Sequence, residues 1–192
     1  MRIAPLEPPF APEVDDQLRS MMPPGAPPIA LFRTFAKNLP MAAAMQPWGR
    51  HELGRAFSLS LRDREIVIDR TCARCGCEYE WGVHIAFFAD RAALDTAQIT
   101  SLTHGEAGDP CWSSPRDRLL IRVADALHDH GDLDDLLWAE LRAEFDEAQL
   151  LDLTMLGGWY HAISFTARAA RVPLEPGAPR FSDYASPAGQ PH

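Results

Sequence analysis

Glu65, Cys77 and His84 are the residues whose types and spacing best fit a chemical site. A cysteine is a nucleophile once it loses its proton, a histidine can exchange that proton, and a glutamate can orient the histidine and stabilise its charged form. On a helix that starts near Cys77, side chains advance by about 100° per residue, so Cys77, Glu80 and His84 lie within about 60° of one another. The spacing therefore predicts proton exchange between a thiol and an imidazole.

Glu65 cannot lie on that same continuous helix, so the chain must break between the two. Gly76 is placed to stop the preceding helix and let Glu65 approach from the side. Cys77 then lies at a helix N-terminus, where partial positive charge favours the thiolate. Glu78 and Glu80 oppose the thiolate by their negative charge. The sequence leaves open which effect prevails.

The surrounding residues resemble the carboxymuconolactone decarboxylase and alkylhydroperoxidase D family. The resemblance rests on the spacing of Glu65, Cys77 and His84 and on the segment Gly76-Cys77-Glu78-Tyr79-Glu80-Trp81. It implies a relay glutamate at Glu65, the first cysteine at Cys77 and a relay histidine at His84. It also implies a compact all-α bundle of about seven to nine helices that assembles as a homo-oligomer and uses no cofactor. The family's second cysteine is replaced by Glu80, so its usual disulfide cannot form there.

The other cysteines leave alternatives open. An oxidised Cys77 needs a second thiol, and Cys72, Cys75 or the more distant Cys111 could supply it. Cys72 and Cys75 could equally be buried, inert side chains. A zinc site made of Cys72, Cys75, Cys77 and His84 is the less favoured interpretation, because Cys72 and Cys75 should point away from the Cys77–His84 face. We expect no metal.

Several aromatic and histidine side chains could support the site. Tyr79 and Trp81 are expected in the core or beside the reacting groups, and His161 in the last helix could join them. His128 and His130 are interpreted as favourable charges at a helix C-terminus.

Helical patterns continue through most of the chain, with no sustained alternation typical of strands. We expect helices over 13–21, 29–37, 41–55, 61–74, 78–93, 95–102, 114–130, 134–144 and 146–170. The helices from residue 29 onward form one domain over 29–172, between a proline-rich arm (1–28) that holds the first helix and an irregular tail (173–192). Arg62-Asp63-Arg64 is echoed by Arg116-Asp117-Arg118 at another helix start, which either duplication or chance explains.

Composition narrows the function. The 192 residues carry a net charge of −9 and Cys72, Cys75 and Cys77 cluster within six positions. The charge argues against nucleic acid and anionic membranes as partners, and the clustering fits a reduced, cytoplasmic site better than a disulfide framework. The favoured function is a peroxidase-like thiol oxidoreductase acting on a hydroperoxide. The alternatives are a non-redox enzyme acting on a small carboxylated lactone, and an oligomeric scaffold without activity.

Overall fold

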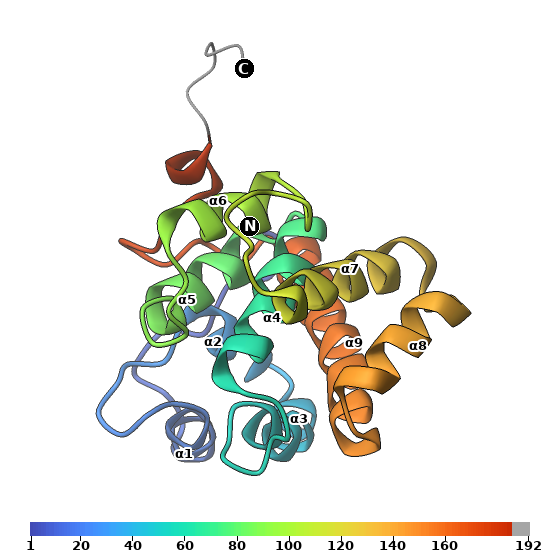
Figure 1. Ribbon diagram of the computed structural model, residues 1–192. Helices are drawn as coiled ribbons and strands as arrows, with labels where there is room; N and C mark the ends of the chain where they lie inside the picture. Colours follow the sequence, from blue (N-terminus) through green and yellow to red (C-terminus); the bar gives the residue numbers. More distant parts are fainter. Residues whose placement is uncertain (186–192) are drawn as a thin grey trace. The chain divides into compact units, whose positions relative to one another are not determined.

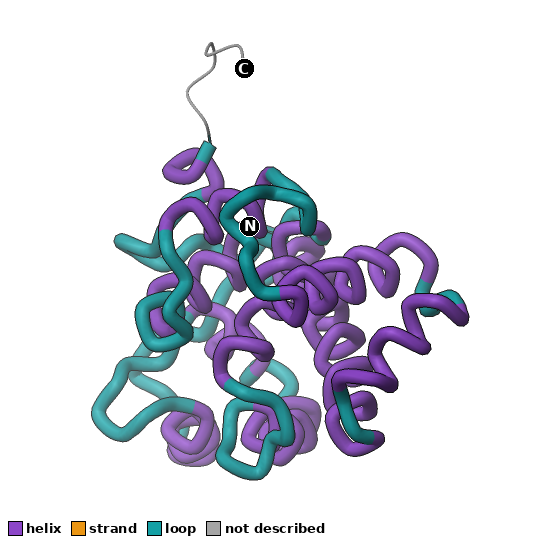
Figure 2. Tube along the Cα trace, in the orientation of Figure 1, coloured by secondary structure: helices purple, strands orange, loops and turns teal. Residues whose placement is uncertain are grey.

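The computed structural model describes residues 1–185, and these form helices and turns without a strand (Figures 1 and 2). The all-α prediction is confirmed. The described helices are α1 (Pro12–Met21), α2 (Ala30–Phe35), α3 (Leu39–Glu52), α4 (Leu61–Arg74), α5 (Glu78–Phe88), α6 (Thr96–His104), α7 (Pro115–His130), α8 (Asp135–Glu144), α9 (Glu147–Ala170) and the 3-10 turn η1 (Phe181–Tyr184). Within residues 1–185, no helix combines the length and apolar character needed to cross a bilayer.

Helix ends follow local signals that the sequence displays. The Ser60 and Ser114 hydroxyls cap α4 and α7, and Gly131 ends α7 with a φ of 67°. The predicted end of α5 at residue 93 is wrong: this helix stops at Phe88, and turns follow. Ala93 has a φ of 52°, which lies in the left-handed region and cannot continue an α-helix.

The chain divides into two compact units. One comprises residues 1–57 and 166–176, and the other begins at Ser58, runs to Phe165 and resumes at Gly177. The arm over 1–28 contains α1, and the described part of the tail contains η1. Residues 186–192 of the predicted tail lie outside the described residues. The arm, domain and tail boundaries stay predictions.

In the second unit, α4 packs against α5, α6 and α7 (Figure 1). Every residue from Asp63 to Cys72 is buried. Charged side chains on such a helix need partners, because an unpaired buried charge is costly. Arg70 accordingly pairs with Asp125, with Nε and Oδ1 2.7 Å apart.

The sequence echo becomes a reciprocal pair of ion pairs between α4 and α7. Arg62 Nη2 lies 2.8 Å from Asp117 Oδ2, and Arg116 Nη2 lies 2.9 Å from Asp63 Oδ2. Each helix thus contributes an arginine and an aspartate at corresponding positions, and each arginine pairs with the aspartate of the other helix, as in surfaces related by a two-fold axis. The echoed residues thus pair with each other across the two helix starts.

The C-terminal segment from Gly177 lies against α5. The rings of Phe181 and Tyr184 meet the Trp81 ring edge-on, with centroids 5.0 and 5.5 Å apart. The Phe181 backbone N–H donates to Glu78 Oε1 at 2.8 Å. A β-carbon at Gly82 would lie only 2.6 Å from the Pro179 carbonyl oxygen, so this close approach depends on glycine.

We expect Gly82→Val to destabilise the protein by about 1–3 kcal/mol, because the added side chain overpacks against backbone. Urea denaturation measures the change. Gly49→Ala is the matched control, since a β-carbon at Gly49 in α3 meets nothing within 4 Å; it should leave stability unchanged or raise it. Equal effects of the two variants would contradict the packing argument.

Candidate active site

Glu65 and His84 form the centre of the predicted site. Glu65 Oε2 accepts a hydrogen bond from His84 Nδ1 at 2.7 Å, and Glu65 Oε1 accepts from Arg64 Nε at 2.7 Å. Glu65 is fully buried, and His84 is 3% exposed. The contact joins α4 to α5 across the Gly76 turn.

The other ring nitrogen of His84 faces two oxygens. Its Nε2 lies 3.1 Å from the Tyr160 hydroxyl and 3.6 Å from Glu80 Oε1. Burial alone would lower the pKa of His84, but the charges and hydrogen bonds of Glu65 and Glu80 outweigh burial and raise that pKa to about 10. The ring is therefore an imidazolium at neutral pH, with Glu65 as its counter-ion.

The turn between α4 and α5 is a Schellman motif. The Gly76 N–H donates to the Ala73 carbonyl at 2.9 Å, and the Cys77 N–H donates to the Cys72 carbonyl at 2.8 Å. Gly76 takes a φ of 62°, which glycine adopts without strain. In this motif the side chains at the two positions occupied by Cys72 and Cys77 commonly touch.

Both of these thiols are buried and near the same hydroxyl. Ser164 Oγ donates to Cys72 Sγ at 3.8 Å. Burial raises the pKa of Cys77 to about 11; the Glu80 backbone N–H and the Ser164 hydroxyl lower it, and the Glu80 carboxylate raises it further. Burial likewise raises the pKa of Cys72. At the start of α5, burial thus raises the pKa of Cys77 by more than the backbone N–H of the helix N-terminus lowers it.

Asp69 is a buried carboxyl that the sequence reasoning missed. It lies one turn after Glu65 on α4, is 1% exposed, and neither of its oxygens has a hydrogen-bond partner among the described residues. Burial, and then the Glu65 charge, raise its pKa well above its ordinary value. The spacing of four from Glu65 was visible in the sequence, but only the burial of the whole of α4 makes it informative.

The other residues singled out from the sequence lie outside the Glu65–His84 contact. Trp81 is fully buried against the C-terminal segment, and Tyr79 is 5% exposed. Cys111 lies in the loop before α7, where its carbonyl accepts from Gln98. In α9, Tyr160 is the residue that contacts His84, whereas the His161 ring contacts His128.

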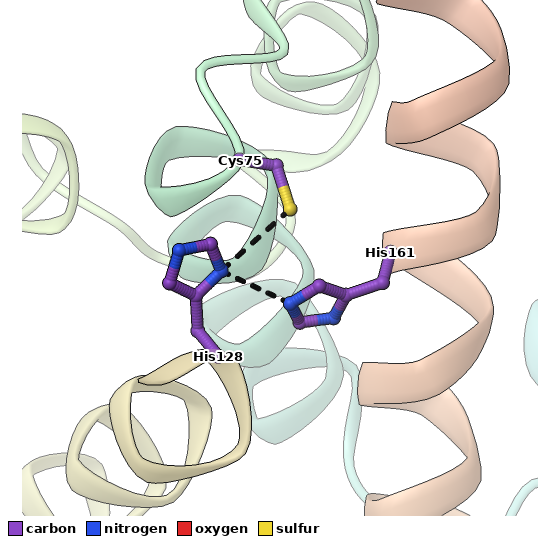
Figure 3. A group of neighbouring side chains, drawn as sticks. All are labelled: Cys75, His128 and His161. Carbon is purple, nitrogen blue, oxygen red and sulfur yellow. Dashed lines mark hydrogen bonds between the residues drawn. The ribbon is translucent and has the colours of Figure 1, made fainter. Parts of the chain in front are cut away.

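Cys75 belongs to a second group of side chains (Figure 3). Its sulfur lies 3.8 Å from His128 Nδ1, and that nitrogen lies 3.0 Å from His161 Nε2. The zinc site considered from the sequence, made of Cys72, Cys75, Cys77 and His84, does not assemble. Cys75 faces His128, Cys72 faces Ser164 and His84 faces Glu65.

Three solved structures resemble this one over nearly the whole chain. An uncharacterized peroxidase-related protein from Silicibacter sp. TM1040 matches with a TM-score of 0.78 and 16% identity, over 93% of this chain and 95% of that chain. The debrominase Bmp8 in its apo form matches with a TM-score of 0.65 and 17% identity, over 91% of this chain and 92% of its own. A cysteine-to-alanine variant of Bmp8 in complex with 2,3,4-tribromopyrrole matches with a TM-score of 0.66 and 16% identity, over 92% of each chain.

The chain matches no protein-family model, and no curated protein matches its sequence. Identities of 16–17% establish a likeness of fold. The described residues form helices without strands, which is the all-α architecture that the sequence resemblance implied. The chain therefore has the alkylhydroperoxidase D-like helical fold, which it shares with the peroxidase-related protein and the debrominase.

Proposed function

We propose that this protein is a cofactor-free thiol oxidoreductase in which Cys77 reacts with substrate and Cys72 resolves the oxidised product. The observation that carries the proposal is the Schellman turn, which ties Cys77 to Cys72 by a backbone hydrogen bond of 2.8 Å. The Ser164 hydroxyl donates a hydrogen bond to Cys72 and lowers the pKa of Cys77. Cys75 is the weaker candidate because its sulfur faces His128.

The favoured substrate class is a small hydroperoxide. The Cys77 sulfur attacks the distal peroxide oxygen, the O–O bond breaks, and an alcohol leaves as Cys77 becomes a sulfenic acid. The Cys72 thiol then attacks that sulfur, releasing water and forming a Cys72–Cys77 disulfide. An external dithiol reductant returns both thiols. Two electrons pass from the thiols to the peroxide in each cycle.

The relay supplies and removes protons in this cycle. Glu80, between Cys77 and His84 on α5, is placed to accept the thiol proton. His84 is the acid that protonates the departing oxygen, since its ring is already charged. Glu65 and Arg64 hold the ring and balance its charge. This assigns the base role to Glu80, which occupies the family's second cysteine position.

A second candidate reaction is reductive dehalogenation. The likeness to a debrominase, whose cysteine variant binds 2,3,4-tribromopyrrole, favours it. The same two thiols would supply the electrons: a carbon–bromine bond becomes carbon–hydrogen, bromide leaves with a proton, and the thiols form a disulfide. The two reactions differ in the oxidant and share Cys77 and Cys72.

The first prediction concerns the thiols. Hydrogen peroxide should convert Cys72 and Cys77 into one intramolecular disulfide, detected by mass mapping. Cys77→Ser should reduce peroxide turnover to the uncatalysed level. Cys72→Ser should stop at a sulfenic acid on Cys77, and Cys111→Ser should behave as the unaltered protein.

The outcomes separate the alternatives. A Cys77→Ser protein that keeps activity on a carboxylated lactone, together with a His84→Ala protein that loses it, would establish the non-redox enzyme. Oxidation by 2,3,4-tribromopyrrole and not by peroxide would establish dehalogenation. A protein in which no cysteine reacts with either compound would be the scaffold.

The second prediction concerns the charge of His84. Because its folded pKa of about 10 exceeds the unfolded value of 6.5, its stabilising effect is complete below pH 6.5 and is lost as pH rises towards 10. Nitrogen NMR should show an imidazolium at pH 8 in the folded protein and a neutral ring after denaturation. Glu65→Gln should lower the ring pKa by about 1–3 pH units. A neutral ring at pH 8 in the folded protein would refute the acid role.

The third prediction concerns assembly, which we propose is homo-oligomeric. Leu151, Met155 and Phe165 are 67%, 51% and 60% exposed on α9, and their spacing places them within about 80° of one another. Light scattering should give a multiple of the 21.3 kDa chain mass. Changing Leu151 and Met155 to Arg should reduce the mass, whereas Leu53→Arg, at another exposed leucine, should not. A monomeric unaltered protein would contradict the proposal.

A further inference from the structure

We propose that Cys75, His128 and His161 bind a transition-metal ion, with zinc(II) as the favoured metal. Within residues 1–185, these three side chains bring one sulfur and two ring nitrogens within 4.8 Å of one another. They come from the end of α4, the last turn of α7 and the middle of α9 (Figure 3). The proposal does not rest on the redox function, because neither Cys77 nor the Glu65–His84 pair is a ligand.

The separations fit a tetrahedral ion. Zinc–nitrogen bonds of about 2.05 Å and zinc–sulfur bonds of about 2.3 Å place ligands about 3.4 Å apart for two nitrogens and about 3.6 Å apart for nitrogen and sulfur. His128 Nδ1 lies 3.0 Å from His161 Nε2 and 3.8 Å from Cys75 Sγ. The third pair, Cys75 Sγ and His161 Nε2, lies within 4.8 Å, so the ligand atoms would close in around a bound ion.

The outer contacts orient the ligand atoms. His161 Nδ1 donates to the Gly157 carbonyl at 2.7 Å, one turn earlier in α9. That bond fixes the tautomer in which His161 Nε2 carries the lone pair that faces His128. A backbone carbonyl on the far nitrogen is the arrangement that metal-binding histidines use. Without metal, His128 Nδ1 donates its hydrogen to His161 Nε2, and an ion would replace that hydrogen.

The three side chains differ in burial, and this difference leaves one side of the group accessible to a cation. Cys75 is 4% exposed, whereas His128 and His161 are half-buried, so an ion can enter from the histidine side. A thiolate and two neutral imidazoles leave one positive charge on a bound zinc. Nearby charges of both signs act on His128: Arg74 opposes a bound cation, and Asp129 and Asp125 favour it. Three protein ligands leave a fourth position for water or another small ligand.

Ligand type selects the metal. One sulfur with two imidazoles suits zinc and copper and disfavours magnesium and calcium, which take oxygen ligands. Cobalt(II) is a spectroscopic substitute for zinc, and its absorption reports both thiolate ligation and tetrahedral coordination. The simpler interpretation is a hydrogen-bonded pair of stacked histidine rings, 5.2 Å apart, beside an inert thiol.

The test uses the full chain, freed of metal with a chelator and titrated with zinc chloride against a chromophoric chelator. We expect one zinc per chain. His128→Gln and His161→Gln should each weaken binding by about 100-fold or more, since even outer contacts contribute 10–100-fold. His130→Gln, at an exposed histidine on the same helix end, should have no effect. Cobalt(II) should give a sulfur-to-metal charge-transfer band that Cys75→Ser abolishes.

Three results would overturn the proposal: no zinc binding, binding that survives both histidine changes, or a cobalt spectrum without a thiolate band. The His128→Gln protein also distinguishes this site from the redox function. It should lose zinc while peroxide still oxidises Cys77 to the disulfide. Failure of that oxidation in the unaltered protein would remove the redox function and leave the metal site standing.

Discussion

The buried contact between Glu65 and His84 is the interaction on which the site depends. It places a carboxylate and an imidazolium inside the second unit, where each is stable only while the other is present. Removing one partner from such a pair costs about 3–5 kcal/mol because the remaining charge is uncompensated. The pair therefore fixes how α4 and α5 meet, and through His84 it fixes where Tyr160 and Glu80 lie.

The Schellman turn at Gly76 divides three cysteines between two sites. Its backbone bonds keep Cys72 and Cys77 together, while Cys75, the residue that ends α4, faces α7 and α9. On a continuous helix, side chains advance by about 100° per residue. Cys72 and Cys77 would then point about 140° apart and would not lie together. A single left-handed glycine thus keeps Cys72 and Cys77 on one turn and directs Cys75 towards His128.

Most of the fold and the centre of the site follow from local sequence. Gly76 and Gly131 mark helix ends in the sequence, and the bounds predicted for α4, 61–74, are those of the structure. The Ser60 cap at the start of α4 is a further local signal. The sequence named His161 as a possible supporting residue, and in the structure its neighbour Tyr160 contacts His84 while His161 contacts His128. Adjacent residues on α9 differ by about 100°, and the sequence does not fix which of them faces α5. Asp69 and the Cys75–His128–His161 group required tertiary structure, since their meaning comes from burial and from helices far apart in sequence.

The reciprocal ion pairs of α4 and α7 show which positions of the two helices correspond. Arg62 and Asp63 correspond to Arg116 and Asp117, and the capping Ser60 corresponds to Ser114. The position that corresponds to Glu65 is Leu119, which is buried. An apolar side chain there cannot hold an imidazolium, so the second helix keeps the architecture without the relay. The charged pairs thus join both helix starts, whereas of the two helices only α4 carries a glutamate at this position to pair with an imidazole.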